Sequence, residues 1–203
     1  MKEKIFLDFD NTLMQFIDYF LNEINKIEGI ELKSFNYTEE DNKEIVKKHY
    51  DFIKTGDHYS KMELFENSME FIDNLNKKFD IHIVTSNISS DQKKYKNKYI
   101  VNTFGEKIKS VINARKKHPH TKEGDFIDDD IKKIKAHIEN NETKGILINH
   151  NGMFNHNQEE LEELKKHSNF IYCESFEDIL NIYNLKKPKS KIKNQKSTNN
   201  INK

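Results

Sequence analysis

Two aspartates at the end of the first apolar run could carry chemistry. Asp8 and Asp10 close the run Ile5–Phe9 with one residue between them, and Asn11 and Thr12 follow directly. In a buried strand the alternation of side chains would place both carboxylates on one face at the carboxyl end, where open α/β sheets bind ligands. Two neighbouring carboxylates repel unless a cation lies between them or one stays protonated. Both solutions suit a site that handles phosphate, whereas acids before a helix that only cap its first turn are the ordinary alternative.

A second acidic cluster follows another apolar run. Asp128, Asp129 and Asp130 are consecutive, and nothing adjacent in the sequence neutralises them. A helix N-terminus whose dipole stabilises first-turn acids is the ordinary explanation, and it suits Asp130. The functional interpretation makes Asp128 a hard oxygen ligand for Mg²⁺, together with Asp8 and the backbone carbonyl of Asp10. Asp129 would then support the site as a further acid.

Side chains that could grip a phosphate lie between the two acidic clusters. Thr85 and Ser86 end an apolar run, and a hydroxyl at such a strand end can donate a hydrogen bond to a phosphate oxygen. A lysine near the second cluster would offset the carboxylates and bind the phosphate. Lys116, Lys117 and Lys122 are all candidates, and any one of them taken alone is more often a solvated surface charge.

Apolar patterning predicts the elements that must position these residues. Strand-like runs recur at 5–9, 80–85, 108–112, 125–127, 145–149 and 170–173. Helical patterns lie between most of them, at 14–27, 39–54, 62–77, 90–102, 130–140, 158–167 and 176–184. This alternation predicts an α/β fold with a mostly parallel, doubly wound sheet.

The connection between the first two predicted strands is oversized. It holds about 65 residues, whereas a plain crossover needs roughly a dozen or more. The surplus is enough for a small helical cap above the carboxyl edge of the sheet, and extra helices on the sheet face are the alternative. We predict a core of residues 1–13 and 79–185, a helical cap of residues 14–78 and a disordered basic tail of residues 186–203.

Charge and composition exclude several classes of protein. The last 18 residues carry seven lysines and no acid, which leaves 27 basic and 34 acidic side chains in residues 1–185. So acidic a body is a poor general platform for nucleic acid. The single cysteine, Cys173, excludes an internal disulfide. With no signal-peptide pattern and no run long enough for a membrane span, we expect a soluble cytoplasmic protein.

In their order along the chain, these motifs resemble the haloacid dehalogenase (HAD) phosphohydrolase superfamily. The matches are D-x-D-x-T at Asp8, Asp10 and Thr12, a hydroxyl at Thr85, a lysine, and acids that begin at Asp128. Lys117 fits the family interval best, eleven residues before the last motif, and Ser86 is an additional candidate for phosphate contact. The resemblance covers about 170 residues and implies a Rossmann-like core.

Within the superfamily the chain looks most like the 5′(3′)-deoxyribonucleotidases, which have a small helical cap, use Mg²⁺ and act on nucleoside monophosphates. That likeness implies that Phe16, six residues after Asp10, stacks on the base. Phe16 also lies on an apolar helical stripe, so core packing is an equal alternative. The sequence departs from this family at three points. Asn11-Thr12 follows the second aspartate, one extra residue separates the lysine from Asp128, and the chain has no tryptophan.

The resemblance also implies a mechanism. Asp8 would attack phosphorus, and Asp10 would act as general acid and then general base. Mg²⁺ held by Asp8, Asp10 and Asp128 would act with phosphate contacts from Thr85, Ser86 and Lys117, while Thr12 would fix the loop through a backbone hydrogen bond. Hydrolysis of another small phosphomonoester, such as a sugar phosphate, is the alternative. A receiver-like signalling module is less consistent with the long insertion. The expected partner is a small phosphomonoester, without nucleic acid or membrane.

Overall fold

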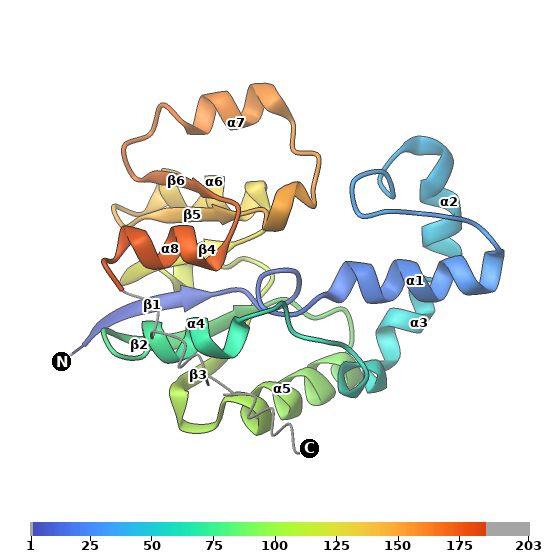
Figure 1. Cartoon of the computed structure of the whole chain (residues 1–203), viewed down its shortest axis with the longest axis horizontal. Helices are drawn as coiled ribbons and strands as arrows, with labels where there is room; N and C mark the ends of the chain where they lie inside the picture. Colours follow the sequence, from blue (N-terminus) through green and yellow to red (C-terminus); the bar gives the residue numbers. More distant parts are fainter. Residues whose placement is uncertain (1, 186–203) are drawn as a thin grey trace, which may run out of the picture.

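Six parallel strands form one sheet in the computed structural model, which describes residues 2–185 (Figure 1). The strands are β1 (Glu3–Leu7), β2 (Phe79–Thr85), β3 (Ile108–Asn113), β4 (Gly124–Asp128), β5 (Gly145–Ile148) and β6 (Phe170–Cys173). Their spatial order is β3-β2-β1-β4-β5-β6, so the direction of winding reverses between β1 and β4. The predicted Rossmann-like, doubly wound parallel sheet is confirmed. The predicted basic tail lies outside the described residues.

Both faces of the sheet are buried, and β1 shows why. Ile5 and Leu7 point into a core cluster that contains residues of α4 (Ser68–Leu75), α5 (Ser90–Phe104) and α8 (Phe176–Ile182). Phe6 points the other way, into a cluster built with α6 (Ile131–Asn140) and α7 (Gln158–Leu164). The strand is therefore apolar throughout, as expected for a central parallel strand.

A glycine allows the two strands at the switch point to approach each other. Gly124 pairs with Lys4 across β1 and β4. A Cβ atom at position 124 would lie 2.2 Å from the carbonyl oxygen of Lys4, which no ordinary contact allows. Gly124 thus holds β4 against β1, and this sets the spacing of the side chains at their carboxyl ends.

The insertion after β1 divides into two parts in space. The helices α1 (Phe16–Glu28), α2 (Glu40–Lys48) and α3 (Tyr50–Thr55) project to one side of the sheet (Figure 1). Side chains of α1 and Leu32 form a separate apolar cluster there. The helix α4 instead packs on α8, with the rings of Phe71 and Phe176 stacked at 4.3 Å. We propose that α1, α2 and α3 form the cap, whereas α4 belongs to the core.

The segment between Met14 and Leu64, which carries α1–α3 and is called the projecting segment below, begins and ends at neighbouring points. Met14 and Leu64 form an isolated antiparallel bridge, the Gln15 N–H donates to the Glu63 carbonyl, and the Phe65 N–H donates to the Leu13 carbonyl. This pairing explains why the helix predicted over 62–77 begins only at Ser68: its first residues are extended. The helix predicted over 39–54 breaks at His49, where ψ is 8°.

Four short 3₁₀ turns complete the described elements: η1 (Asp57–Ser60), η2 (Gly105–Lys107), η3 (His118–His120) and η4 (His150–Gly152). Within residues 2–185, no helix combines the length and the apolar character that crossing a bilayer requires. The predicted alternation of strands and helices otherwise holds along the core.

The buried side chain of His137 links α6 to the loops that contain Thr121 and Thr143. His137 is fully buried; its Nδ1 lies 2.8 Å from the Thr121 hydroxyl and its Nε2 3.1 Å from the Thr143 hydroxyl. Burial lowers the pKa of His137 from 6.5 to about 4. Between these values the unfolded chain binds more protons than the folded protein, so folding stability falls as the pH falls.

We expect His137→Gln to flatten the acid side of the stability profile. The wild type should lose on the order of 2 kcal/mol more than the variant between pH 7 and pH 4, because His137 must be deprotonated to fold. Urea unfolding at a series of pH values measures this difference. His167→Gln is the control, since His167 is exposed. Parallel profiles for wild type and His137→Gln would contradict the prediction.

Candidate active site

The switch point brings two of the predicted aspartates together. Leu7 pairs with Ile127, and the next residues, Asp8 and Asp128, leave the two strands side by side. The Asp8 N–H continues the ladder, donating to the Ile127 carbonyl at 2.8 Å. Carboxylate oxygens of Asp8, Asp128 and Asp129 all lie within 4.8 Å of one another. Because Asp8 and Asp128 are also buried, these charges cannot be screened by water.

Lys117 supplies the positive charge of this carboxylate cluster. Its Nζ lies 2.8 Å from Asp8 Oδ1 and 2.8 Å from Asp128 Oδ2. Burial alone would lower the pKa of Lys117, but the carboxylates of Asp128 and Asp8 raise it above its ordinary value, so the side chain stays charged. Lys116 and Lys122 are exposed. Of the three candidates, the structure therefore brings Lys117 alone into the cluster.

The carboxylate cluster retains surplus negative charge. Burial raises the pKa of Asp128 to about 7 even though Lys117 opposes the rise, and Asp8 adds to it. Burial, followed by Asp128 and Asp8, raises the pKa of Asp129 well above its ordinary value. A set of three carboxylates, with oxygen donors only, is what a hard divalent cation such as Mg²⁺ binds. The residues present therefore fit this ion.

The membership of this cluster differs in detail from the predicted metal set. Asp129, expected to play a supporting part, contributes its carboxylate directly. The side chain of Asp10 lies in a different network, described below, so Asp10 could join the ion only through its backbone carbonyl. That contribution stays a prediction.

The Asp10 carboxylate is held by two donors. Its Oδ2 accepts a hydrogen bond from the Lys96 ammonium at 2.6 Å, and the Tyr59 hydroxyl lies 3.0 Å from its Oδ1. Burial raises the pKa of Asp10 and Asp8 adds to the rise, whereas Lys96 and Tyr59 lower it. The two aspartates of the first motif thus lie in different surroundings, one beside Lys117 and the other beside Lys96.

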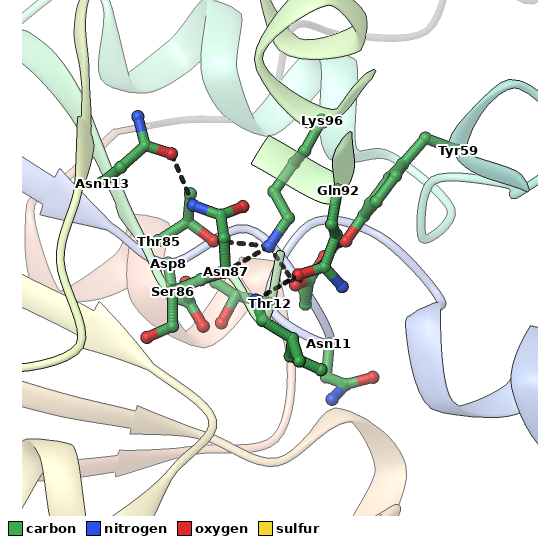
Figure 2. A network of polar contacts seen from close by, with 12 residues as sticks. Asp8, Asn11, Thr12, Tyr59, Thr85, Ser86, Asn87, Gln92, Lys96 and Asn113 are labelled. Carbon is green, nitrogen blue, oxygen red and sulfur yellow. Dashed lines mark hydrogen bonds and ion pairs between the residues drawn. The ribbon is translucent and has the colours of Figure 1, made fainter. Parts of the chain in front are cut away.

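Lys96 is a candidate site residue that the sequence analysis does not single out. It is fully buried, and besides Asp10 it donates to the Thr85 hydroxyl at 3.1 Å and to the Ser86 carbonyl at 2.6 Å (Figure 2). A signal for it exists in the sequence, because Lys96 stands four residues before Ile100 on the buried face of α5, with Gln92 four residues earlier. The lysines at 93, 94 and 98 lie off that face and are exposed.

The predicted phosphate contacts lie beside Lys96. An ammonium only donates, so the Thr85 oxygen must accept from Lys96, and its own proton is left free to donate elsewhere. The Ser86 hydroxyl donates to the Ala114 carbonyl at 3.2 Å. The Thr85 hydroxyl therefore keeps a free proton but is fully buried in this structure, and the contact predicted for Ser86 would have to compete with the bond to Ala114. Both phosphate contacts stay predictions.

The loop between Asp10 and α1 has its own supports. Asn11 takes a positive φ of 56°, and its Oδ1 accepts from the Ile17 N–H at 2.8 Å. The Thr12 hydroxyl donates to Asp129 Oδ1 at 3.3 Å. The predicted bond from Thr12 to the backbone of its own loop is replaced by this bond, which links the first acidic motif to the last. His150 Nε2 lies 3.0 Å from the Thr12 carbonyl oxygen, and this contact also supports the loop.

Phe16 starts α1 and packs inside the projecting segment. Its ring stacks on Tyr59 at 6.2 Å and lies 6.4 Å from His58. These contacts correspond to the core-packing alternative for this residue. Its role in stacking on a base stays a prediction.

Comparisons with solved structures agree with the fold. YfnB from Bacillus subtilis, described as a HAD-hydrolase bound to magnesium, superimposes with a TM-score of 0.58 at 14% identity, over 90% of this chain and 99% of that one. A haloacid dehalogenase-like hydrolase from Streptococcus pneumoniae gives 0.56 at 13%, over 90% and 98%. A protein from Lactobacillus plantarum described as a phosphoglycolate phosphatase gives 0.51 at 15%, over 90% and 99%.

No family model matches the sequence, and no curated protein does. The solved structures therefore establish the class at the level of the fold: this chain has the HAD-like Rossmann fold, and its structural neighbours are HAD-like hydrolases. The particular activity has to be argued from the residues at the switch point.

Loss of Lys117 should destabilise the fold in a way that a divalent cation relieves. In Lys117→Met, two buried carboxylates lose their partner, which we expect to cost about 3 kcal/mol of unfolding free energy in chelator. Excess Mg²⁺ should recover part of this loss, because it replaces the missing charge. Denaturant unfolding with and without Mg²⁺ measures both effects. Lys116→Met is the matched control, and an equal loss in both variants would contradict the prediction.

Proposed function

We propose that the protein is a Mg²⁺-dependent phosphomonoesterase that hydrolyses nucleoside monophosphates through an aspartyl-phosphate intermediate. The observation that carries the proposal is the convergence of Asp8, Asp128, Asp129 and Lys117 at the switch point, with Asp10 held nearby by other donors. A nucleophile, an acid or base in separate surroundings and a cation site are the parts that phosphoryl transfer requires.

The first step would be attack by Asp8. A carboxylate oxygen of Asp8 forms a bond to phosphorus while the bond to the leaving oxygen breaks. Asp10 gives its proton to that oxygen, which departs as an alcohol. Burial and the neighbouring Asp8 raise the pKa of Asp10, and this favours the protonated form that the step needs. Lys96 and Tyr59 hold the carboxyl group in place while it acts.

The second step would be hydrolysis of the intermediate. Asp10, now a carboxylate, takes a proton from water as the water oxygen attacks phosphorus, and the bond to Asp8 breaks to release inorganic phosphate. Lys96 stabilises Asp10 in this charged form. Lys117 and the Thr85 hydroxyl would bind phosphate oxygens. Mg²⁺, held by Asp8, Asp128 and Asp129, would supply further charge stabilisation for the phosphoryl group.

The nucleoside part of the proposal rests on the resemblance of the sequence motifs to those of the deoxyribonucleotidases. Residues 1–185 are acidic overall, which disfavours long polyanions more than a single small phosphate. The partner is therefore proposed to be a nucleoside monophosphate, with a sugar phosphate as the competing substrate of the same chemistry.

Replacement of the nucleophile should abolish turnover. We expect Asp8→Asn to lower kcat for nucleoside monophosphates by at least about a thousandfold, because no aspartyl-phosphate can form. Release of inorganic phosphate in Mg²⁺, measured on a panel of nucleotides and sugar phosphates, tests both the chemistry and the substrate class. If the wild type leaves every nucleotide and a generic aryl phosphate intact, the proposed function is wrong.

Lys96 should matter most when the leaving group is poor. It positions Asp10, and protonation by Asp10 is needed for an alkyl oxygen but hardly for p-nitrophenolate. We expect Lys96→Met to lower kcat on the order of a hundredfold for a nucleoside 5′-monophosphate and much less for p-nitrophenyl phosphate. Lys98→Met, on the exposed side of the same helix, is the control. Equal losses on the two substrates would show that Lys96 serves only the structure.

A further inference from the structure

A cavity opens directly beside the carboxylate cluster. It has a volume of about 360 Å³ and lies between the loop that follows α1, the start of α6 and the loop after η4. Asn11 and Asp129 are among its lining residues, which places the cavity next to the carboxylate cluster. Four ring-bearing side chains also line it: Phe35, Tyr37, Phe154 and His156.

The rings come from both parts of the molecule. Phe35 and Tyr37 belong to the projecting segment, whereas Phe154 and His156 belong to the core. Phe35 is 55% exposed, which is unusual for so large an apolar side chain beside a cavity. The other three are half-buried. A planar group that entered between them would cover apolar surface contributed by both parts.

The core side of this cavity is already ordered. The Asn149 side chain accepts from the Phe154 N–H at 2.8 Å and donates to the Phe154 carbonyl at 2.9 Å, so the backbone of this loop is fixed. His156 Nε2 is buried and has no hydrogen-bond partner among residues 2–185. This nitrogen is enclosed by protein, so it is not a contact offered to a ligand in this structure.

The charge of the cavity restricts what can bind. Asp129 and Asp130 are the charged residues that line it, and within the described part of the chain no lysine or arginine does so. Burial lowers the pKa of His156, so its ring is neutral at pH 7. Apart from the Mg²⁺ proposed at Asp129, a second anionic group on the substrate would meet the Asp130 carboxylate and no lysine or arginine of the described residues. The lining thus disfavours bisphosphates and phosphorylated acids.

We propose that this cavity binds the leaving group of the substrate, and that it selects an uncharged planar ring with polar edges, as a nucleobase has, between Phe35 and Tyr37 on one side and Phe154 and His156 on the other. The assignment rests on the proposed function, since it takes the phosphate to lie at the carboxylate cluster. It places the base away from Phe16, whose ring is packed against Tyr59.

The first experiment separates ring binding from chemistry. Binding of adenosine, which has no phosphate, is measured by calorimetry to wild type and to Phe35→Ala and Tyr37→Ala. Because a stacked base is lost in each variant, we expect its dissociation constant to rise about tenfold or more. Tyr50→Ala is the control, since Tyr50 is 42% exposed on α3 and does not line the cavity. Undiminished binding in both cavity variants would overturn the proposal.

The second experiment uses turnover. With AMP as substrate, Phe35→Ala and Tyr37→Ala should raise KM about tenfold, while KM for glycerol 2-phosphate, which has no ring, should stay unchanged. Asn155→Lys adds a cation to the exposed rim of the cavity and should improve kcat/KM for fructose 1,6-bisphosphate several-fold relative to AMP. If Phe16→Ala alone produces the AMP-specific loss, the base lies elsewhere and the proposal is wrong.

The two proposals fail in different ways. A protein that binds adenosine through Phe35 and Tyr37 but hydrolyses no phosphomonoester would contradict the proposed function and keep the ring site. A protein that hydrolyses AMP and glycerol 2-phosphate equally well, with or without Phe35, would keep the function and remove the ring site.

Discussion

The mutual repulsion of buried carboxylates is the constraint on which this structure depends. Asp8 and Asp128 leave adjacent central strands with Asp129 beside them, and burial removes the water that would otherwise screen their charges. One lysine, Lys117, offsets part of this charge from within the fold. A divalent cation would offset the remainder, so the arrangement that threatens stability is also the one that fits the proposed Mg²⁺ site. The proposed metal site and the electrostatic cost to folding stability thus arise from the same carboxylates.

A second lysine divides the first motif into two environments. Lys117 pairs with Asp8, whereas Lys96 pairs with Asp10 and with the strand end at Thr85. Two chemically identical carboxylates two residues apart thereby acquire different partners, and in the proposed mechanism this difference would let one attack and the other carry a proton. The two lysines come from different elements: Lys96 from α5, which follows β2, and Lys117 from the loop between β3 and β4.

The sequence was most informative where chemistry and periodicity coincide. An apolar run that ends in acids can be located without coordinates, so Asp8, Asp128 and the parallel sheet were predictable. The lysine beside the carboxylates could be narrowed only to Lys116, Lys117 and Lys122, because the burial of one lysine in a loop depends on contacts far away in sequence. Lys96 was missed because a lysine in a lysine-rich helix looks solvated unless its position relative to Ile100 is weighed. The ring-lined cavity joins loops more than a hundred residues apart, and no local pattern encodes that meeting.

The isolated bridge between Met14 and Leu64 has a consequence for how insertions and deletions in the projecting segment affect the fold. Since the chain leaves the sheet and returns to it at one hydrogen-bonded point, whatever is spliced between those residues begins and ends at the same place. Lengthening such a loop adds only slowly to its closure entropy. The projecting segment can therefore change in length at little cost in closure entropy, provided that Tyr59, which lies within it and donates to Asp10, is kept.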